Sequence, residues 1–453
     1  MSESNELIDY VLIDEIRRLL DRFQWISSYE LFYQKIEKIE TQLIQKHRKT
    51  HEVNLKKKSN SGISLRIISK SRRLVETSLG ISSLHKITNL TEPKSTQKKE
   101  EILIFPQLKN PRIKSIAGDQ SKSFNFQENT VLEKLEDLKL EDPENEFEES
   151  SNSLNLERET RYIINTGSNG ISNSSLKVNL NHSVKILFDY FVYTISRNDY
   201  RRNLNFNRKQ LELDVFENRV KRSKRFVNAN LDDVSIIFHP NIIGKIIAFQ
   251  SNSLISNPRN QFSPIWNDQI HLYDDPLREE GYASTLFDDE GNITKSKVLV
   301  EKGNFQNSLN TIITGGPSNS GNGYRSAWFQ PLSRSYEYPV SRAISNLVMM
   351  GGIGKGINFV QKRTVSLLVV KGHGYIGGMA NNPKFVIHAS EAELWKNGEY
   401  LGPTYNYTFS GSLNEIMKYG DLSADQTQVV DKAIPGAVYI GWLRCPPGII
   451  KVG

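Results

Sequence analysis

The first segment with a clear hydrophobic period is residues 5–25. Its apolar positions recur at three- and four-residue spacing, while charged residues occupy the opposite side: Leu12, Ile16, Leu19, Leu20 and Phe23. That spacing predicts an amphipathic helix that buries one face.

Residues 29–48 are rich in Ile, Tyr and Phe and fit either a helix or a strand; we favour a strand. We expect a turn over residues 50–52 and two further strands over 53–58 and 63–68. The run from Ser59 to Gly62 has the composition of a turn and separates them. One helix followed by an antiparallel meander predicts an α+β amino-terminal domain.

The pattern weakens over residues 91–153, which we interpret as a charged, partly flexible insertion. Leucines among charges predict a short helix over residues 131–140, and an acidic connection follows over residues 142–153. Alternating polar and apolar residues predict a strand over residues 204–212.

The second half has cleaner patterning. Val234 to Phe238 predicts a strand, and Pro240 can take the first position of a helix. Glycine-bounded apolar runs follow and predict strands: residues 298–300, 365–370, 385–387 and 438–443. We therefore predict an α+β chain of two domains, residues 1–225 and residues 226–453, the second β-rich with large antiparallel or mixed sheets.

Composition narrows the class of protein. The chain has 453 residues, 38% hydrophobic, and no run of about 18 apolar residues, which excludes a multi-span membrane protein. We find no signal-peptide pattern, and the single cysteine excludes an intramolecular disulfide framework. We expect a cytoplasmic protein.

The net charge of +7 hides two opposed blocks. Residues 41–125 carry 18 Lys or Arg and 6 Asp or Glu, whereas residues 126–160 carry 3 and 12. The basic block could bind nucleic acid, or the acidic block could fold back and screen it.

Local motifs do not assemble a complete active site. His47 and His51 lack the glutamate of a zinc-protease helix, and Gly351–Gly356 fails the phosphate-loop pattern twice, so we expect a tight turn or close backbone packing there. We expect Cys445 to be a buried, inert thiol. Asp288, Asp289 and Glu290 could bind calcium or act as acid and base, but the spacing favours a turn.

Several segments in order, over about 150 residues, resemble the carboxy-terminal region of the TldD/PmbA peptidase family. They are Leu272–Pro276, Phe287–Gly291, Leu299–Gly303, Ser318–Arg325, Ser345–Leu347 with Gly351–Gly352, and Glu393–Glu399 with Gly402–Pro403. The amino-terminal half resembles that family's first domain more loosely, and residues 91–153 depart from it.

The resemblance implies where a zinc site would be. In the family, the TldD type carries a His-Glu-x-x-x-His helix and a later Cys as zinc ligands, and the PmbA type, also called TldE, lacks them. Here the first pair falls on Ala248 and Phe249, the second His near Asn252 or Ser253, and the Cys near residues 422–424. Ala and Phe offer no lone pair to zinc. The chain therefore looks like the non-catalytic subunit, with no cofactor of its own.

The resemblance also implies partners. A TldD-type subunit would hold the zinc, and the heterodimer would enclose a chamber for unfolded or modified peptides. Candidate peptide contacts in this chain are Asn319, Asn322, Arg325 and Asn346, for which turn formation or strand capping is an equal alternative. Two other functions stay open: nucleic-acid binding through residues 41–125, and a stand-alone peptide-maturation enzyme with an unfamiliar site.

Overall fold

The computed structural model forms two compact units that interleave along the chain. The amino-terminal unit comprises residues 1–206, 276–295 and 310–343, and the carboxy-terminal unit comprises residues 207–275, 296–309 and 344–453. Arg225, where we predict the domain boundary, lies outside the described residues. These are residues 8–46, 49–91, 105, 108, 128–137, 147–166, 168–188, 191–206, 227, 234–256, 266–316, 320–327, 330–352, 354–361, 365–379, 382–404, 407–430 and 436–453.

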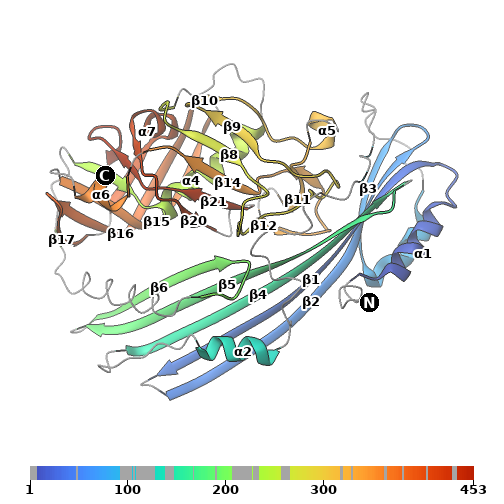
Figure 1. Cartoon of the computed structure of the whole chain (residues 1–453), viewed down its shortest axis with the longest axis horizontal. Helices are drawn as coiled ribbons and strands as arrows, with labels where there is room; N and C mark the ends of the chain where they lie inside the picture. Colours follow the sequence, from blue (N-terminus) through green and yellow to red (C-terminus); the bar gives the residue numbers. More distant parts are fainter. Residues whose placement is uncertain are drawn as a thin grey trace. The chain divides into compact units, whose positions relative to one another are not determined.

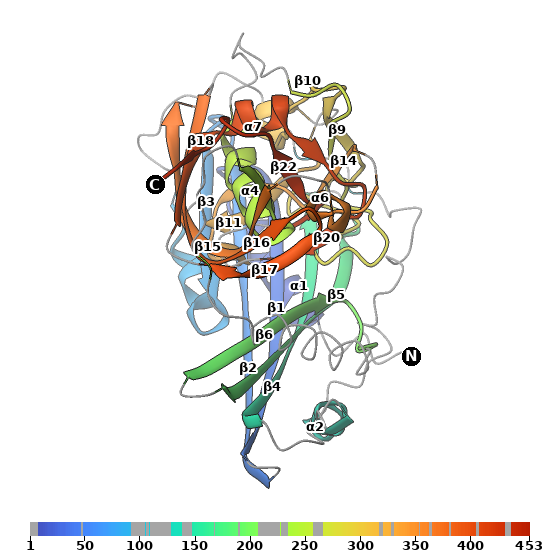
Figure 2. The ribbon, with the colours of Figure 1, turned by 90° about the vertical axis from the view of Figure 1, so that its left-hand side faces the viewer.

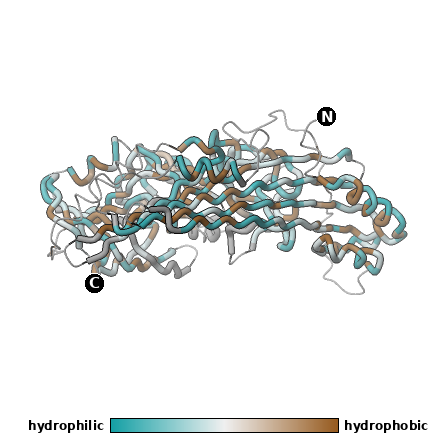
Figure 3. The backbone as a smooth tube through the Cα atoms, turned by 90° about the horizontal axis from the view of Figure 1, so that it is seen from below, coloured by the Kyte–Doolittle hydropathy of each residue, from teal (hydrophilic) through white to brown (hydrophobic). Residues whose placement is uncertain are grey.

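A six-stranded antiparallel sheet of order β3-β2-β1-β4-β5-β6 forms the body of the amino-terminal unit (Figure 1). Its strands are β1 (Ile26–Lys46), β2 (Lys49–Ser69), β3 (Leu74–Gly80), β4 (Phe147–Asn165), β5 (Ile171–Phe188) and β6 (Phe191–Arg201). Polar and apolar residues alternate along these strands (Figure 3), so the two faces of the sheet differ in chemistry.

One face of this sheet is apolar and carries helix α1 (Tyr10–Leu20). Asp9 caps the helix by accepting a hydrogen bond from the Leu12 backbone, and the predicted amphipathic helix is confirmed with narrower bounds. Its buried residues pack with alternate strand residues in one core: Ile13, Ile16 and Leu20 with Tyr29, Leu31, Tyr33, Ile63, Leu65 and Ile67. The 3-10 helix η2 (Ile81–Asn89) joins this core through Ile87.

Two predictions about the meander are wrong. Residues 49–69 form one continuous strand, in which Ser59 and Gly62 pair with Glu37 and Gln34 of β1. Residues 147–153 are not a connection but the start of β4, because pairing with β1 and β5 satisfies their backbone groups. Residues 141–146 lie outside the described part.

The other predictions for this half have mixed outcomes. The strand over residues 29–48 is confirmed as β1, and the short helix as α2 (Glu128–Asp137). Residues 50–52 belong to β2 and form no turn. No strand is assigned to residues 204–206, and residues 207–212 lie outside the described residues.

Segments from the second half of the chain complete the amino-terminal unit. They form the short helix α5 (Ile312–Gly315) and a three-stranded sheet of order β12-β11-β13. Its strands are β11 (Gly323–Ala327), β12 (Gln330–Arg334) and β13 (Val340–Arg342).

The carboxy-terminal unit has two mixed sheets, as its glycine-bounded runs predict (Figure 2). The larger has the order β19-β22-β7-β15-β16-β18-β23, with β17 also paired to β16, and the smaller has the order β10-β9-β8-β14-β21-β20. The larger comprises β7 (Ser235–Phe238), β15 (Val365–Met379), β16 (Asn382–Lys396), β17 (Glu399–Thr404), β18 (Tyr407–Ser412), β19 (Asp421–Leu422), β22 (Leu443–Cys445) and β23 (Lys451–Val452). The smaller comprises β8 (His271–Asp274), β9 (Lys297–Glu301), β10 (Asn304–Phe305), β14 (Asn346–Met350), β20 (Thr427–Val429) and β21 (Ala437–Ile440).

Helix α4 (Pro240–Ser256) packs against strands of both sheets and begins at the predicted proline. Two shorter helices, α6 (Ile357–Val360) and α7 (Leu413–Tyr419), belong to the same unit. In the described part of the chain, no helix is both long and apolar enough to span a membrane.

Candidate functional site

Helix α4 occupies the position at which the family resemblance expects metal ligands. It follows β7 directly, and its first turn closes through hydrogen bonds from the Ile242 and Ile243 backbones to the His239 carbonyl, at 2.9 and 3.2 Å. Ile246 and Ile247 are buried in the core beside Ala248, whose exposure is 0%. The methyl group at the first ligand position therefore packs in the core and supplies no donor atom to a metal.

The position expected for the third ligand is occupied by the end of β19. Leu422 is buried, and Ser423 is fixed by backbone pairing: its amide donates to the Trp442 carbonyl at 2.9 Å, and its hydroxyl oxygen accepts from the Trp442 amide at 2.8 Å. Among the residues that the structure describes, no group of three His, Cys, Asp or Glu side chains could hold a metal ion.

The glycine run next to this strand has the packing role that we predict. Gly351 and Gly352 adopt φ values of 133° and 82°. A Cβ added at Gly352 would lie 1.6 Å from the Leu422 carbonyl oxygen. Only glycine permits this approach of two backbones.

The predicted peptide contacts fall in different parts of the chain. Asn319 lies outside the described residues. Asn322 and Arg325 are in the amino-terminal unit, with exposures of 1% and 0%. Asn346 is in the carboxy-terminal unit, where its side-chain amide donates to the Asp275 carbonyl at 3.0 Å. Peptide binding by these residues stays a prediction.

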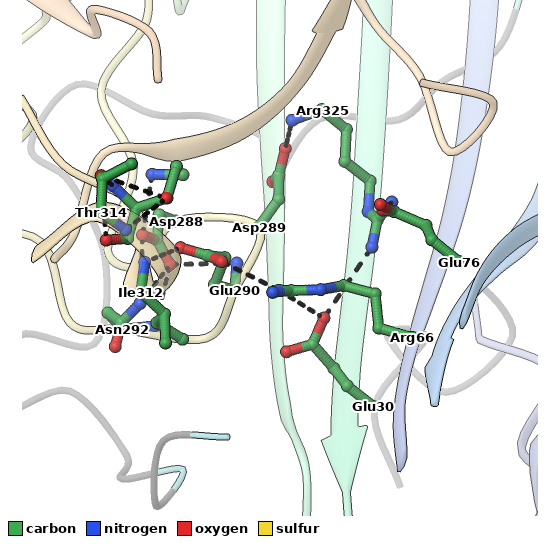
Figure 4. Close-up of polar contacts among 12 residues, drawn as sticks. Glu30, Arg66, Glu76, Asp288, Asp289, Glu290, Asn292, Ile312, Thr314 and Arg325 are labelled. Carbon is green, nitrogen blue, oxygen red and sulfur yellow. Dashed lines mark hydrogen bonds and ion pairs between the residues drawn. The ribbon is translucent and has the colours of Figure 1, made fainter. Parts of the chain in front are cut away.

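A buried cluster of charges on the second face of the long sheet is the feature that our sequence reasoning missed (Figure 4). The strand residues on this face alternate with those under α1, yet they are also buried: Glu30, Gln34, Ser64, Arg66, Glu159 and Arg161. In sequence, a charged residue inside an apolar run, such as Arg66 between Leu65 and Ile67, was the available signal.

The acidic turn at residues 288–291 covers part of this face. The turn is confirmed: the Gly291 amide donates to the Asp288 carbonyl at 3.1 Å, and Gly291 has a φ of 80°. The Asp288 carboxylate accepts backbone hydrogen bonds from Glu290 and Gly323, each at 3.0 Å. The Asp288 carboxylate therefore shapes the turn and joins it to β11.

The other two carboxylates of the turn bind the strands of the long sheet. Glu290 accepts from Arg66 Nη1 at 2.9 Å with one oxygen and from the Ile312 amide at 2.7 Å with the other. Asp289 accepts from Arg161 Nη1 at 2.6 Å and from the Arg325 amide at 2.7 Å. Arginine and backbone N–H groups thus occupy the oxygens that a calcium ion would need.

Burial and ion pairing shift the acids of the cluster in opposite directions. Burial raises the pKa of Glu30 to about 7, although Arg66 and Arg325 oppose the shift. Burial also acts on Glu159, but Lys177 and Arg161 outweigh it and lower its pKa to about 2. Burial beside Glu290 raises the pKa of Asp288. The arrangement is that of a structural network joining β1, β2, β4 and the acidic turn.

Comparison with known proteins identifies a family model for the carboxy-terminal part of the chain. Residues 233–447 match the PmbA/TldA metallopeptidase C-terminal domain. The chain is 28% identical over 164 residues to the metalloprotease TldD homolog of Buchnera aphidicola subsp. Acyrthosiphon pisum. That alignment covers 35% of this chain and 32% of the relative, so the chain matches about a third of that protein's length.

Solved structures share the fold over nearly the whole chain. TldE from Thermococcus kodakarensis superposes with a TM-score of 0.76 at 18% identity, covering 97% of this chain and 99% of TldE. A Thermotoga maritima protein, described as a proposed modulator of a DNA gyrase, superposes with a TM-score of 0.70 at 14% identity. The superposition covers 98% of this chain and 100% of that protein. The match over residues 233–447 extends from β7 and α4 to β22. Residues 233–447 therefore carry the carboxy-terminal domain of the TldD/PmbA family.

Proposed function

We propose that this chain is the non-catalytic, PmbA/TldE-type member of a peptidase pair and that its partner is a TldD-type subunit that binds zinc. The match of residues 233–447 to a metallopeptidase C-terminal domain supports the peptidase context. A TldE is among the structures with the same fold, and a TldD homolog is among the relatives in sequence.

The observation that carries the proposal is the chemistry of α4. The two adjacent positions that would supply a zinc ligand and the catalytic base hold Ala248 and Phe249. Neither side chain has a lone pair to bind Zn²⁺ or to accept a proton from a metal-bound water. Hydrolysis in such a pair would then take place on the partner, and this chain would complete the chamber that admits extended peptides.

The proposal is tested by co-expressing the chain with a TldD-type protein from the same genome. We expect the two chains to elute together on size exclusion, with about one zinc ion per pair, and the pair to cleave unstructured peptides. Separate elution together with a partner that is fully active alone would refute the proposal.

The isolated chain provides a second measurement. We expect metal analysis of the isolated chain to find no stoichiometric zinc. We also expect the isolated chain to cleave no peptide. One variant tests the position itself: Ala248→Gly should leave the assembly and its activity intact, because that position does no chemistry. Stoichiometric zinc in the isolated wild-type chain would overturn the non-catalytic assignment.

A further inference from the structure

Residues 49–61 of β2 form an edge of the long sheet in the described part of the chain. On one side they pair with β1, from Lys46↔Lys49 to Lys35↔Ser61. On the other side β3 pairs only with residues 62–68, so in the described part of the chain β1 is the one strand paired with residues 49–61 (Figure 1). Alternate backbone N–H and C=O groups on that outer side point away from the sheet and can accept another strand.

Three consecutive lysines lie on this edge. Lys56, Lys57 and Lys58 are all exposed, and because side chains alternate along a strand they present positive charge on both faces of the sheet. Lys58 forms an ion pair with Glu40 of β1 at 3.1 Å, and the two side chains stay 49% and 40% exposed. The edge therefore favours an acidic neighbour.

An apolar row continues from the lysines toward the tip of the hairpin. Leu55 and Val53 are registered opposite Thr41 and Leu43, which are both buried. Val53 itself is 47% exposed. A strand added at the edge would extend this row by placing its own apolar side chains beside Val53 and Leu55.

We infer that the β2 edge binds an extended acidic peptide by antiparallel strand addition. The inference rests on the proposed peptide-handling function, and it specifies the segment: consecutive carboxylates opposite Lys58, Lys57 and Lys56, followed by alternating apolar residues opposite Leu55 and Val53. Backbone hydrogen bonds fix the strand, and the lysines select its charge.

The experiment uses the full-length isolated chain and a fluorescein-labelled peptide, Ser-Glu-Glu-Glu-Val-Thr-Val-Thr, followed by fluorescence anisotropy. We expect saturable binding that weakens roughly tenfold in the variant Lys56→Thr/Lys57→Thr/Lys58→Thr, as the loss of three exposed ion pairs implies. A variant with the same charge change in the other unit, Lys355→Thr/Lys384→Thr/Lys451→Thr, should bind as the wild type does.

Two N-methylated peptides separate strand pairing from charge attraction. The two peptides differ in phase, that is, in which set of alternate amides is methylated: one phase blocks the N–H groups that face the β2 edge, and the other leaves them intact. We expect the peptide with intact edge-facing N–H groups to bind and the other peptide to fail. Equal binding of both phases, tighter binding of a competing single-stranded oligonucleotide, or no binding of the unmodified peptide would each overturn the inference. None of these results affects co-elution with a TldD-type partner, so the two proposals fail separately.

Discussion

A close approach between Gly62 of β2 and the ring of Tyr336 gives the sharpest test of how the amino-terminal unit is assembled. Gly62 lies on the face of the sheet that carries the charged cluster, since its neighbour Ile63 faces α1. A Cβ added at Gly62 would lie 2.2 Å from Tyr336 Cζ, where ordinary contacts begin near 3.4 Å. Gly62→Ala therefore requires the ring or the strand to move by about 1 Å.

The expected free-energy change has two opposing parts. In an extended strand, alanine is favoured over glycine by about 0.5–1 kcal/mol. Overpacking a filled site costs about 1–3 kcal/mol, and Tyr336 has little room to move because it packs with Phe32 and Phe287 in one core. The Tyr336 amide is also held by Gln34 Oε1 at 2.8 Å. The net expectation is a loss of about 1–2 kcal/mol in local stability.

Hydrogen exchange measured by mass spectrometry reports this locally. In Gly62→Ala, amides of residues 330–342 should exchange roughly five- to thirtyfold faster, which corresponds to 1–2 kcal/mol. Gly80→Ala is the matched control: Gly80 pairs with Gly62, and its added Cβ would meet the Tyr336 hydroxyl at an ordinary 3.6 Å. Adding Tyr336→Leu to Gly62→Ala should cancel most of the strain. Unchanged or slower exchange in Gly62→Ala would refute the reasoning.

Four further tests probe the buried charges and the thiol. Arg66→Met should cost about 3–5 kcal/mol in urea unfolding, because it removes the cation that pairs with both Glu30 and Glu290 in the buried cluster; a loss under 1 kcal/mol would contradict this. The pKa of Glu159 is lowered to about 2, so its ionised form stabilises the folded state by roughly 3 kcal/mol, and this stabilisation is lost as pH falls from about 4.5 to 2. Glu159→Gln should therefore flatten the acid limb of a plot of unfolding free energy against pH. The raised pKa of Glu30, about 7, has the opposite sign: stability is lost as pH rises from about 4.5 through 7, and Glu30→Gln should remove that loss; parallel profiles would refute both assignments. Cys445 is fully buried and its pKa is raised by burial, so iodoacetamide should modify it only after denaturant is added; rapid native labelling would show that the thiol is accessible.

The elements with one buried apolar face were predictable from the sequence. Helix α1 and the β7–α4 pair follow directly from hydrophobic spacing and from Pro240 at the helix start. The family resemblance identified the positions on α4 where zinc ligands would be expected, which hydrophobic periodicity alone could not do. Local patterns suffice where one face meets a core and the other meets solvent.

Prediction failed where polar residues are buried by segments distant in the sequence. Ser59 to Gly62 has the composition of a turn, but long-range pairing with β1 continues the strand through it. Gly62 is explained by Tyr336, which is 274 residues further along the chain and is invisible to any local window. The same holds for Arg66, whose partner Glu290 lies on a turn that we could identify only as a turn.

The described contacts also change how the charge blocks are interpreted. The acidic block is paired largely by lysines outside the basic block, as in Lys38–Glu157 at 2.7 Å and Lys185–Glu149 at 2.9 Å. Lys46–Glu149, at 3.6 Å, joins the two blocks across β1 and β4. Mutual screening therefore accounts for only part of the basic block.

What the basic block leaves at the surface depends on which of its residues the sheet buries. Arg66 belongs to the block but is 1% exposed, so it contributes internal pairing and no surface potential. Lys56 and Lys57 belong to the same block and are exposed on the outermost described strand at that end of the sheet. Since exposed charge acts on partners and buried charge acts on the fold, the β2 edge, rather than the block as a whole, is where an acidic partner would be attracted.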